Sequence, residues 1–320
     1  MINVLVLSDP AAPHLRPLEK IRNAANLHIG KDPEYVSRLA PDAEVIVNAM
    51  WNGELLRRIF PLAGRAKWIH NLSAGVELTL FPELIESPLP LTNGRGVFAS
   101  SLAEWSLGAA LFFAKDLRRM VRNQEAGRWE PFDVEMLAGR TMGVVGYGGI
   151  GRASARLGAA VGMRVLALRR RPALSEADPW VSAVYAPDRI GAMLAESDYV
   201  LVAAPLTPGT RGLIGRPQIE AMKPNAVIIN VGRGPVVDEA ALLHALENGR
   251  IRGAALDVFE TEPLPEGHPF YKMPNVLLSP HTADHTIGWV ELAVEMFLRN
   301  FERYVRHEPL ENVVDKRAGY

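Results

Sequence analysis

Gly146-Tyr-Gly-Gly-Ile-Gly151 matches the pattern G-x-G-x-x-G, and its surroundings make the match specific. An apolar strand, Met142–Val145, is expected before it, and an alanine-rich helix, Arg152–Ala160, is expected after it. In such a turn the first glycine permits the tight bend, the second lets the backbone approach a pyrophosphate, and the third allows helix and strand to pack closely. The helix N-terminus then favours the negative charge of the pyrophosphate. The predicted dinucleotide-binding residues of this turn are Gly146, Tyr147, Gly148, Gly149, Ile150 and Gly151.

The residues after the next expected strand, Arg164–Leu168, bear on which nicotinamide cofactor is bound. Arg169 and Arg170 stand there, and Arg169 lies 18 residues after Gly151. An NAD site usually carries Asp or Glu near this point, which accepts a hydrogen bond from the ribose 2′-OH. Guanidinium groups instead bind a 2′-phosphate through charge-assisted hydrogen bonds. We therefore predict a preference for NADP(H) through Arg169 and Arg170, with NAD as the alternative; a solvated basic triplet is the structural alternative.

The chain on both sides of the glycine turn alternates expected strands and helices, which is typical of doubly wound parallel sheets. We predict two α/β domains. A Rossmann-type nucleotide-binding domain, residues 101–286, is inserted in a smaller flavodoxin-like substrate domain formed by residues 1–100 and 287–320. The expected strands are Ile2–Leu7, Val45–Val47, Trp68–His70, Pro90–Thr92, Thr141–Tyr147, Arg164–Leu168, Ala183–Ala186, Tyr199–Ala203, Ala226–Val231, Gly253–Val258 and Val276–Ser279.

Helices are expected between most of these strands, and two further helices lie near the predicted domain boundaries. An apolar helix over residues 101–122 is expected to begin with a capping box, Ser101 to Glu104. A last amphipathic helix is expected over Thr286–Arg306. The remaining expected helices are Glu54–Ile59, Leu78–Ile85, Ile150–Ala160, Arg189–Glu196, Pro217–Met222 and Glu239–Glu247.

Composition excludes several classes of protein. Lys+Arg is 35 and Asp+Glu is 36, giving a formal net charge of −1, which argues against a nucleic-acid partner. There is no cysteine, so disulfides, thiolate metal sites and cysteine nucleophiles are excluded. No apolar stretch is long enough for a membrane helix, and the N-terminus lacks the pattern of a signal peptide. We therefore expect a cytoplasmic protein without a membrane partner.

Three polar segments in the second half follow or close expected strands. They are Asn230–Gly234, Asp257–Pro263 and Ser279–His281. Ligands of open α/β sheets bind beyond the carboxyl ends of the strands, so the three segments can converge on one site.

The ordered set of motifs resembles the D-isomer-specific 2-hydroxyacid dehydrogenase family over nearly the whole chain. It comprises the glycine turn, Pro205–Leu213, Arg233-Gly234, Val236–Glu239, Asp257–Pro263 and Pro280-His281. The resemblance implies that Arg233, Glu262 and His281 are the catalytic residues and that Asp257 contacts the nicotinamide carboxamide. It further implies that the cofactor is lined by Ala204, Pro205, Thr210, Val231 and Gly232. The loop Asn71–Val76 resembles the family's substrate-carboxylate loop, with Ser73, Ala74, Gly75 and Val76 as its binding residues.

These residue types suit reduction of a 2-oxo acid. Arg233 offers a planar fork of donors that can hold the carboxylate and polarise the ketone, and the backbone N–H groups at Ala74–Val76 can complete the grip. As the cofactor gives hydride to the carbonyl carbon, His281 donates a proton to the oxygen. Glu262 orients His281 and favours its protonated form.

Glyoxylate and hydroxypyruvate are the substrates we expect. A bulkier or phosphorylated 2-hydroxy acid is one alternative, although the chain stops at Tyr320 without the further domain of longer phosphoglycerate dehydrogenases. A cofactor-sensing protein without turnover, like the family's corepressor relatives, is another. A homodimer is implied by the resemblance, with the helix around 101–120 as its candidate interface.

Three aromatic residues near these motifs have more than one possible role. Trp51 follows an expected strand and either walls the substrate pocket or packs structurally. His285 and Trp289 follow His281 in the sequence, so they can also reach the cleft. A metal site formed by His281 and His285 is not expected, because His281 stands at a strand end and no third ligand is evident.

Overall fold

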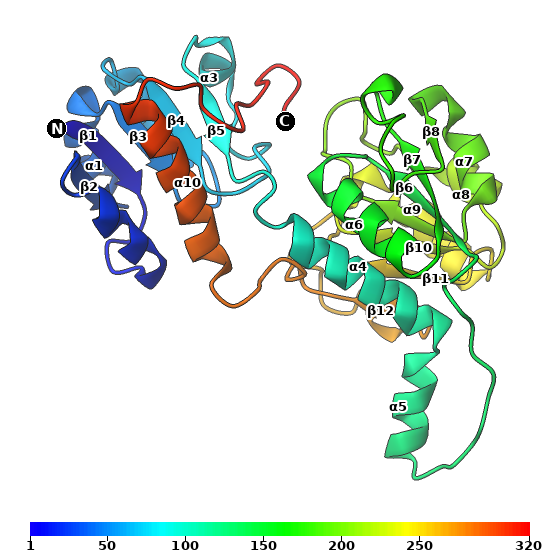
Figure 1. Ribbon diagram of the computed structural model, residues 1–320. Coiled ribbons are helices and arrows are strands. Elements are labelled where there is room, and N and C mark those ends of the chain that lie inside the picture. Colours follow the sequence, from blue (N-terminus) through cyan, green and yellow to red (C-terminus); the bar gives the residue numbers. More distant parts are fainter. The chain divides into compact units, whose positions relative to one another are not determined.

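The computed structural model describes residues 1–320, which form two compact units (Figure 1). Met1–Phe98 and His285–Tyr320 form unit 1, and Ala99–Asp284 form unit 2. Both ends of the chain thus belong to one unit, and the middle forms the other. The sequence analysis put the boundaries after residues 100 and 286, two residues further along the chain in each case.

Unit 1 is built on five parallel strands in the order β2-β1-β3-β4-β5, the flavodoxin-like order. The strands are β1 (Ile2–Leu7), β2 (Ala25–Gly30), β3 (Val45–Asn48), β4 (Trp68–Asn71) and β5 (Leu91–Asn93). The helices are α1 (Pro33–Leu39), α2 (Glu54–Ile59), α3 (Pro82–Glu86) and α10 (Trp289–Val305).

Helix α10 brings the C-terminal part of the chain onto the unit 1 sheet. It begins at Trp289, three residues later than predicted, and buries one apolar face. Phe297 on that face stacks on Trp68 of β4, with ring centroids 5.3 Å apart. Beyond the helix, the N–H of Val314 donates to the carbonyl of Leu91 at 2.8 Å. The C-terminal segment is therefore tied to β5.

Unit 2 is built on seven parallel strands in the order β12-β11-β10-β9-β6-β7-β8. Counted within the unit this is the Rossmann order 3-2-1-4-5-6 with one more strand at the far edge. The strands are β6 (Thr141–Val145), β7 (Arg164–Leu168), β8 (Ala183–Tyr185), β9 (Tyr199–Val202), β10 (Val227–Asn230), β11 (Gly253–Leu256) and β12 (Val276–Leu278). The helices are α4 (Ala99–Ala114), α5 (Leu117–Glu125), α6 (Gly149–Ala160), α7 (Ile190–Glu196), α8 (Arg216–Ala221) and α9 (Glu239–Glu247).

The single apolar helix predicted over residues 101–122 is wrong in two respects. The segment forms two helices, because Asp116 takes a left-handed conformation (φ 46°) and caps α5 with its side chain. The predicted capping box is also absent. Helix α4 begins at Ala99, and the hydroxyl of Ser101 donates to the carbonyl of Ala283 at 2.6 Å.

The two helices differ in burial. α4 packs along α6 and buries seven side chains, whereas α5 buries none. Figure 1 shows α5 and the chain after it extending from the rest of unit 2. No helix of the chain is both long enough and apolar enough to span a bilayer.

Candidate active site

The glycine turn has the geometry that a dinucleotide needs. Gly146 has φ +97°, and a Cβ on it would lie 2.6 Å from the Cα of Ala204 on the neighbouring β9 loop. A Cβ on Gly151 would lie 2.4 Å from the carbonyl oxygen of Gly146. By contrast, a Cβ on Gly148 would meet no atom within 4 Å. The first and third glycines are therefore required by packing, while the second leaves open space in front of the backbone.

That open space lies at the start of α6. Gly148 is the N-cap of this helix and offers no side chain to its free N–H groups. Gly148 and Gly149 are exposed, and Ile150 is half-buried in the first turn. The unpaired N–H groups and the helix dipole suit a phosphate, so the turn fits the pyrophosphate of a dinucleotide.

Tyr147 points into the protein rather than toward the open side of the turn. Its side chain is 4% exposed. Burial, reinforced by the nearby negative charge of Asp178, raises the pKa of Tyr147 to about 12. The carboxylate of Asp178 also pairs with Arg152 in α6 at 2.5 Å. Tyr147 is therefore a buried, uncharged phenol that packs on the inner side of the glycine turn.

The two arginines predicted to select the cofactor follow β7. The N–H of Arg169 donates to the carbonyl of Tyr185 at 3.0 Å, which continues the β7–β8 pairing by one residue. The guanidinium of Arg169 donates to the hydroxyl of Ser175. Arg169 is half-buried and Arg170 is exposed. Arg169 is thus held at the carboxyl end of β7, next to the glycine turn, whose Gly146 N–H bonds to the carbonyl of Leu168 at 3.2 Å.

The other predicted cofactor residues lie on loops after β9 and β10, beside the glycine turn. Ala204 is buried, and a Cβ on Gly232 would lie 2.8 Å from its carbonyl oxygen, so these two loops touch through backbone. Val231 is buried and Pro205 is exposed. The hydroxyl of Thr210 donates to the carbonyl of Pro205 at 2.6 Å, which closes the loop.

Asp257 fixes the segment that carries His281. One oxygen of its buried carboxylate accepts from the N–H groups of Thr282 and Ala283, at 2.9 and 3.0 Å. Its backbone carbonyl accepts from the N–H of His281 at 2.9 Å. These bonds hold His281 in a left-handed conformation with φ 53°. Strained backbone of this kind persists only where the surroundings over-determine it, and it is enriched at active sites.

His281 and Glu262 form an ion pair beside this segment. Nδ1 of His281 lies 2.6 Å from Oε2 of Glu262, while Oε1 of Glu262 accepts from the N–H of Phe259 at 2.9 Å. The hydrogen bond to Glu262 raises the pKa of His281 against the opposing effects of burial and of the positive charge of Arg233. Burial raises the pKa of Glu262, but the bonds from His281 and Phe259 outweigh it and leave that pKa lowered. Both pKa shifts therefore favour the imidazolium–carboxylate form of the pair.

Arg233 stands on the loop after β10. Asn230, the last residue of that strand, donates from its amide to the carbonyl of Arg233 at 3.2 Å and accepts from the N–H of Gly232 at 3.1 Å. The guanidinium of Arg233 donates to the carbonyl of Gly232 at 2.8 Å. A Cβ on Gly234 would overlap the backbone of Phe259 at 1.9 Å. The Arg233 loop therefore packs directly against the segment that leads to Glu262.

In unit 1, the carbonyl groups of the loop after β4 point inward and accept hydrogen bonds from other residues of the unit. The carbonyl of Ser73 accepts from the N–H of Gly94 at 3.1 Å, that of Ala74 from the amide of Asn93 at 2.6 Å, and that of Gly75 from the amide of Asn71 at 3.1 Å. No N–H group from Ser73 to Val76 donates to another protein atom. Clustered N–H groups of this kind suit an anion.

An aromatic stack stands in the same unit. His285 lies parallel to Trp289 with ring centroids 4.2 Å apart, and Trp51 stacks on Trp289 at 5.2 Å. Trp51 is nevertheless 52% exposed. Trp51 therefore has a packing role through one face and keeps a free surface on the other.

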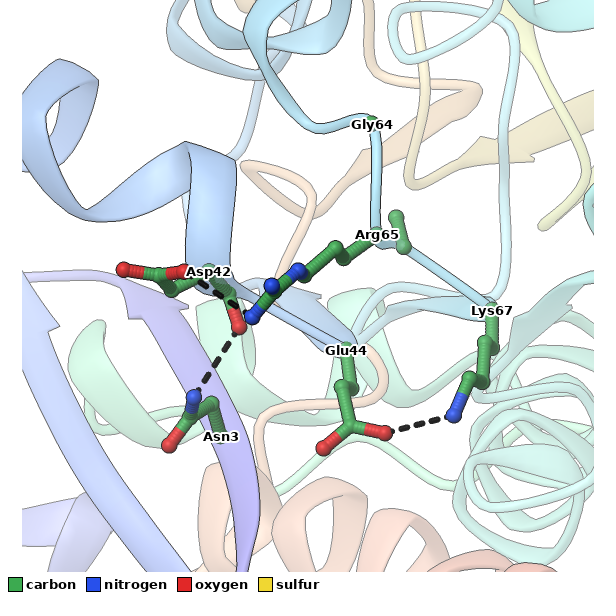
Figure 2. A pocket seen from close by; sticks show the side chains of 7 residues that line it. Asn3, Asp42, Glu44, Gly64, Arg65 and Lys67 are labelled. Atoms are coloured by element: carbon green, nitrogen blue, oxygen red, sulfur yellow. Dashed lines mark hydrogen bonds and ion pairs between the residues drawn. The ribbon is translucent and has the colours of Figure 1, made fainter.

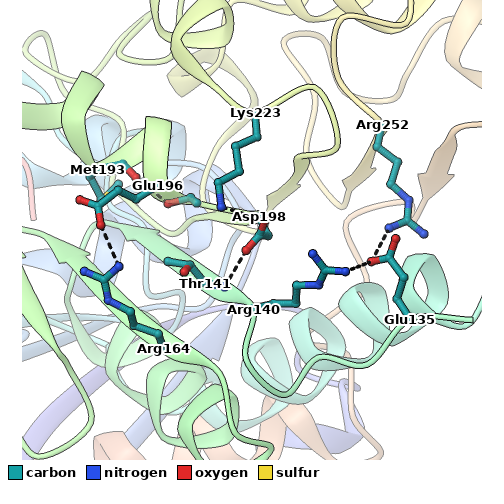
Figure 3. A network of polar contacts seen from close by, with 10 residues as sticks. Glu135, Arg140, Thr141, Arg164, Met193, Glu196, Asp198, Lys223 and Arg252 are labelled. Atoms are coloured by element: carbon teal, nitrogen blue, oxygen red, sulfur yellow. Dashed lines mark hydrogen bonds and ion pairs between the residues drawn. The ribbon is translucent and has the colours of Figure 1, made fainter.

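Two polar clusters lie at the opposite ends of the sheets. In unit 1, a cavity of about 560 Å³ is lined by Glu44, Lys67 and Arg65 beside the amino ends of β3 and β4 (Figure 2). In unit 2, Asp198 accepts from the N–H of Thr141 at 2.8 Å and pairs with Lys223 at 2.9 Å (Figure 3). Ligands bind at the carboxyl ends of parallel strands. These ion pairs lie at the other ends, so we assign them to stabilising the sheets and not to the active site.

Three asparagines support the site loop of unit 1: Asn48, Asn71 and Asn93. Sequence reasoning missed Asn48 and Asn93, and it placed Asn71 only as the first residue of the carboxylate loop. Each is the last residue of a strand and is buried. A polar amide that ends a short apolar run is the signal that could have found them, because a buried amide needs partners.

Comparison with known proteins identifies the class to which this chain is related. A family model described as D-isomer specific 2-hydroxyacid dehydrogenase, NAD binding domain, matches residues 107–283. A glyoxylate reductase of Korarchaeum cryptofilum is 30% identical over 94% of this chain and 93% of its own length. A D-3-phosphoglycerate dehydrogenase of Methanocaldococcus jannaschii is also 30% identical over 98% of this chain, but this chain spans only 60% of that protein.

Solved structures give the same result. An NADPH-dependent glyoxylate/hydroxypyruvate reductase from Sinorhizobium meliloti, in complex with NADP and sulfate, superimposes with a TM-score of 0.86 at 27% identity, covering 100% of both chains. A D-isomer specific 2-hydroxyacid dehydrogenase from Xanthobacter autotrophicus Py2, in complex with NADPH, gives 0.83 at 31% identity and the same coverage. The chain therefore belongs to the D-isomer-specific 2-hydroxyacid dehydrogenase family, whose members are NAD(P)-dependent oxidoreductases acting on CH–OH donors.

Proposed function

We propose that this protein is an NADP(H)-preferring reductase of small 2-oxo acids such as glyoxylate or hydroxypyruvate. The observation that carries the proposal is the ion pair between His281 and Glu262 at 2.6 Å, on a segment packed against the loop of Arg233. A proton donor poised as imidazolium, together with a guanidinium, is what reduction of a ketone next to a carboxylate requires.

In the proposed reaction, unit 2 binds the cofactor and unit 1 binds the substrate. The reduced nicotinamide, when bound, supplies the hydride. Asp257 holds the backbone that carries His281, and Nε2 of His281 donates the proton to the carbonyl oxygen. Glu262 keeps the imidazole protonated and oriented through Nδ1. Arg233 polarises the carbonyl, and the N–H groups of Ser73–Val76 bind the carboxylate. In the reverse direction neutral His281 accepts the proton.

The proposed preference for NADP(H) rests on Arg169 and Arg170. It is supported by their place after β7, and by the NADP or NADPH named in the two similar structures. Replacing both arginines by Ala should lower kcat/KM with NADPH by about 100-fold or more, since each charge-assisted bond to a phosphate contributes about 1.5–3 kcal/mol. The value with NADH should change little. Arg171→Ala, an exposed neighbour in the same triplet, is the matched control; a wild-type preference for NADH would contradict this assignment.

The substrate is tested by following NADPH oxidation with glyoxylate, hydroxypyruvate, pyruvate, phenylpyruvate and 2-ketogluconate, and by the reverse reaction with 3-phosphoglycerate. We expect glyoxylate and hydroxypyruvate to give the highest kcat/KM, and His281→Ala to abolish turnover while NADPH still binds. A higher kcat/KM for a bulky or phosphorylated acid would replace the proposed substrate class. NADPH binding with no turnover of any of them would favour a sensing protein.

We further propose that two chains associate as a homodimer. The sequence analysis put the interface on the helix around residues 101–120, where α4 buries seven of its sixteen residues within unit 2. The exposed apolar side chains lie beyond it, on the extending segment 117–136 formed by α5 and the chain that follows. They are Leu117, Met120, Val121, Trp129, Val134 and Met136. Exposed apolar patches of this kind mark protein interaction sites, and a second copy is the partner that the family implies.

A further inference from the structure

Three asparagines stand in register at the carboxyl ends of three neighbouring strands in unit 1. Asn48 ends β3, Asn71 ends β4 and Asn93 ends β5, and the parallel pairing aligns Asn48 with Asn71 and Asn71 with Asn93. Their exposed fractions are 1%, 0% and 2%. We refer to these three residues as the asparagine ladder. A row of fully buried amides is costly unless each amide makes hydrogen bonds, so its partners show what it holds.

The middle residue joins two loops. The amide oxygen of Asn71 accepts from Nδ2 of Asn48 at 2.9 Å and from the hydroxyl of Thr79 at 3.1 Å. Its Nδ2 donates to the hydroxyl of Ser73 at 2.6 Å and to the carbonyl of Gly75 at 3.1 Å. Both ends of one amide are therefore occupied, and the donor end fixes the loop that carries the free N–H groups.

The outer residues extend the same arrangement. Asn93 donates from Nδ2 to the carbonyl of Ala74 at 2.6 Å. Asn48 uses its second amide hydrogen on the carbonyl of Asn52, at 3.0 Å, next to Trp51. The Oδ1 atom of Asn48 is buried and has no partner. A buried acceptor left unpaired destabilises the fold, so any net stabilisation from Asn48 comes through the hydrogen bonds that its amide donates.

We propose that the asparagine ladder positions the substrate loops, with Asn71 and Asn93 as positioning residues for the 2-oxo acid carboxylate; this rests on the proposed function. By holding the carbonyl groups of Ala74 and Gly75 inward, the two amides turn the N–H groups of Ser73–Val76 outward. Asn48 links the same array to the loop of Trp51. The carboxylate subsite and the Trp51 loop are thus set by one hydrogen-bonded row.

Two substitutions of Asn71 test the hydrogen bonds that its amide donates to the loop. Asn71→Ala removes the bonds that the amide donates to the loop, which go to the hydroxyl and carbonyl of Ser73 and to the carbonyl of Gly75. Asn71→Asp keeps the shape but replaces the donor by a carboxylate oxygen, which would face the carbonyl of Gly75 and repel the substrate carboxylate. Asn300 of α10 is the matched control. It lies in the same unit, is 0% exposed, and bonds the backbone of Glu311 through both ends of its amide, at 3.0 and 2.8 Å.

Binding is measured with oxamate, a carboxylate that cannot be reduced, by thermal shift of the NADPH-saturated enzyme. Turnover of glyoxylate is measured in parallel. Asn71→Ala and Asn93→Ala should raise the half-saturating oxamate concentration and the KM for glyoxylate by about 10- to 100-fold, and Asn71→Asp by more. Asn300→Ala should lower Tm to a similar extent but leave both values within about twofold, as expected for a residue with only a structural role. The Kd for NADPH should not change in any variant.

The outcomes separate the two proposals. Equal effects of Asn71→Ala and Asn300→Ala on oxamate binding would contradict the positioning role of the asparagine ladder. A wild-type enzyme whose Tm is not raised by oxamate would also contradict it. If Asn71→Ala does not fold, Asn93→Ala carries the same comparison. A wild-type enzyme that binds oxamate through the ladder but reduces no 2-oxo acid contradicts the proposed function alone.

Discussion

His281 combines three features that are individually ordinary: a left-handed backbone, a hydrogen bond to a carboxylate, and a raised pKa. Asp257 supplies the first by bonding the backbone on both sides of the turn, and Glu262 supplies the other two. The sequence identified all three residues through their motifs. It could not give the conformation, because a positive φ at a histidine results from contacts that arise only when β11 and β12 lie side by side.

The acid–base role that we propose for this pair predicts a change in pH profile. The pKa of His281 is raised, so protonated His281 persists to higher pH, and the rate of reduction falls as pH rises through that pKa. Glu262→Gln removes the charge that raises it, so the descending limb of log(kcat/KM) should move to lower pH. At a fixed pH above that limb, moving it down by one pH unit reduces the protonated fraction of His281 about tenfold. A profile that does not move would show that Glu262 does not set the proton of His281.

The same pair predicts how folding stability depends on pH. His281 has a raised pKa in the folded state, so its contribution is full below the unfolded value of about 6.5 and is lost as pH rises through the folded value. Glu262 has a lowered pKa, so its contribution is present above about 4.5 and is lost as pH falls through the folded value. The difference in Tm between wild type and Glu262→Gln should therefore be largest between about pH 4.5 and pH 6.5 and shrink as pH rises above the pKa of folded His281. A difference independent of pH would exclude the ion pair as its cause.

At the scale of elements, the accuracy of the predicted strands and helices followed the strength of the local hydrophobic pattern. Central strands such as β6 and β10 are continuous apolar runs and were predicted closely. Strand β2 was missed because it is an edge strand with mostly half-exposed residues, paired only with β1. The capping box failed because the hydroxyl of Ser101 bonds to Ala283, 182 residues away, which no local rule can foresee.

The asparagine ladder shows the same limit in the site itself. The carboxylate loop was identified by its resemblance to the family, and the carbonyl-inward geometry that exposes its N–H groups was not. That geometry depends on the alignment of three strand ends in parallel register, and a sequence read one segment at a time contains no register.

The start of α6 predicts a contrast between two glycines of one turn. Gly148→Val should leave Tm nearly unchanged, because a Cβ there meets nothing within 4 Å and φ is negative. It should raise the Kd for NADPH by at least about tenfold, since the side chain occupies the space for phosphate. Gly146→Ala should instead impair folding, because φ is +97° and Ala204 is 2.6 Å away. Gly191→Ala, on open space in α7, controls for loss of glycine. Normal NADPH binding by a folded Gly148→Val would contradict the proposed phosphate site.

At the scale of the whole molecule, the chain combines two parallel sheets with different strand orders. The order in unit 1 changes direction at β1 and β3, and that in unit 2 at β6 and β9. Ligands bind at such switch points, and the glycine turn follows β6 while the loop of Ala204 follows β9. The strand and helix pattern together with the family resemblance predicted this architecture. The return of α10 onto the first sheet followed from its amphipathic pattern.

The extending segment 117–136 predicts that two chains of the protein associate. The segment is ordered by its own polar contacts: Arg119 pairs with Glu130 at 2.8 Å and lies over the ring of Phe132 at 4.2 Å. Yet Trp129 is 98% exposed and Met120 is 41% exposed. Because the segment is held in one shape while its apolar side chains face water, we expect a partner to cover it.

We therefore expect the wild-type protein to sediment as a dimer and the double variant Met120→Asp/Trp129→Asp to sediment as a monomer at micromolar concentration. Loss of a buried aromatic anchor weakens an interface by about 2 kcal/mol or more, which is about 30-fold in Kd, and a charge in its place adds to this. Leu62→Asp, at an exposed leucine of unit 1, is the control and should remain dimeric. Sedimentation equilibrium over a hundredfold range of protein concentration distinguishes the dimer from the monomer. A double variant that stays dimeric would show that the segment 117–136 is not the interface, and α4 would then be the next surface to test.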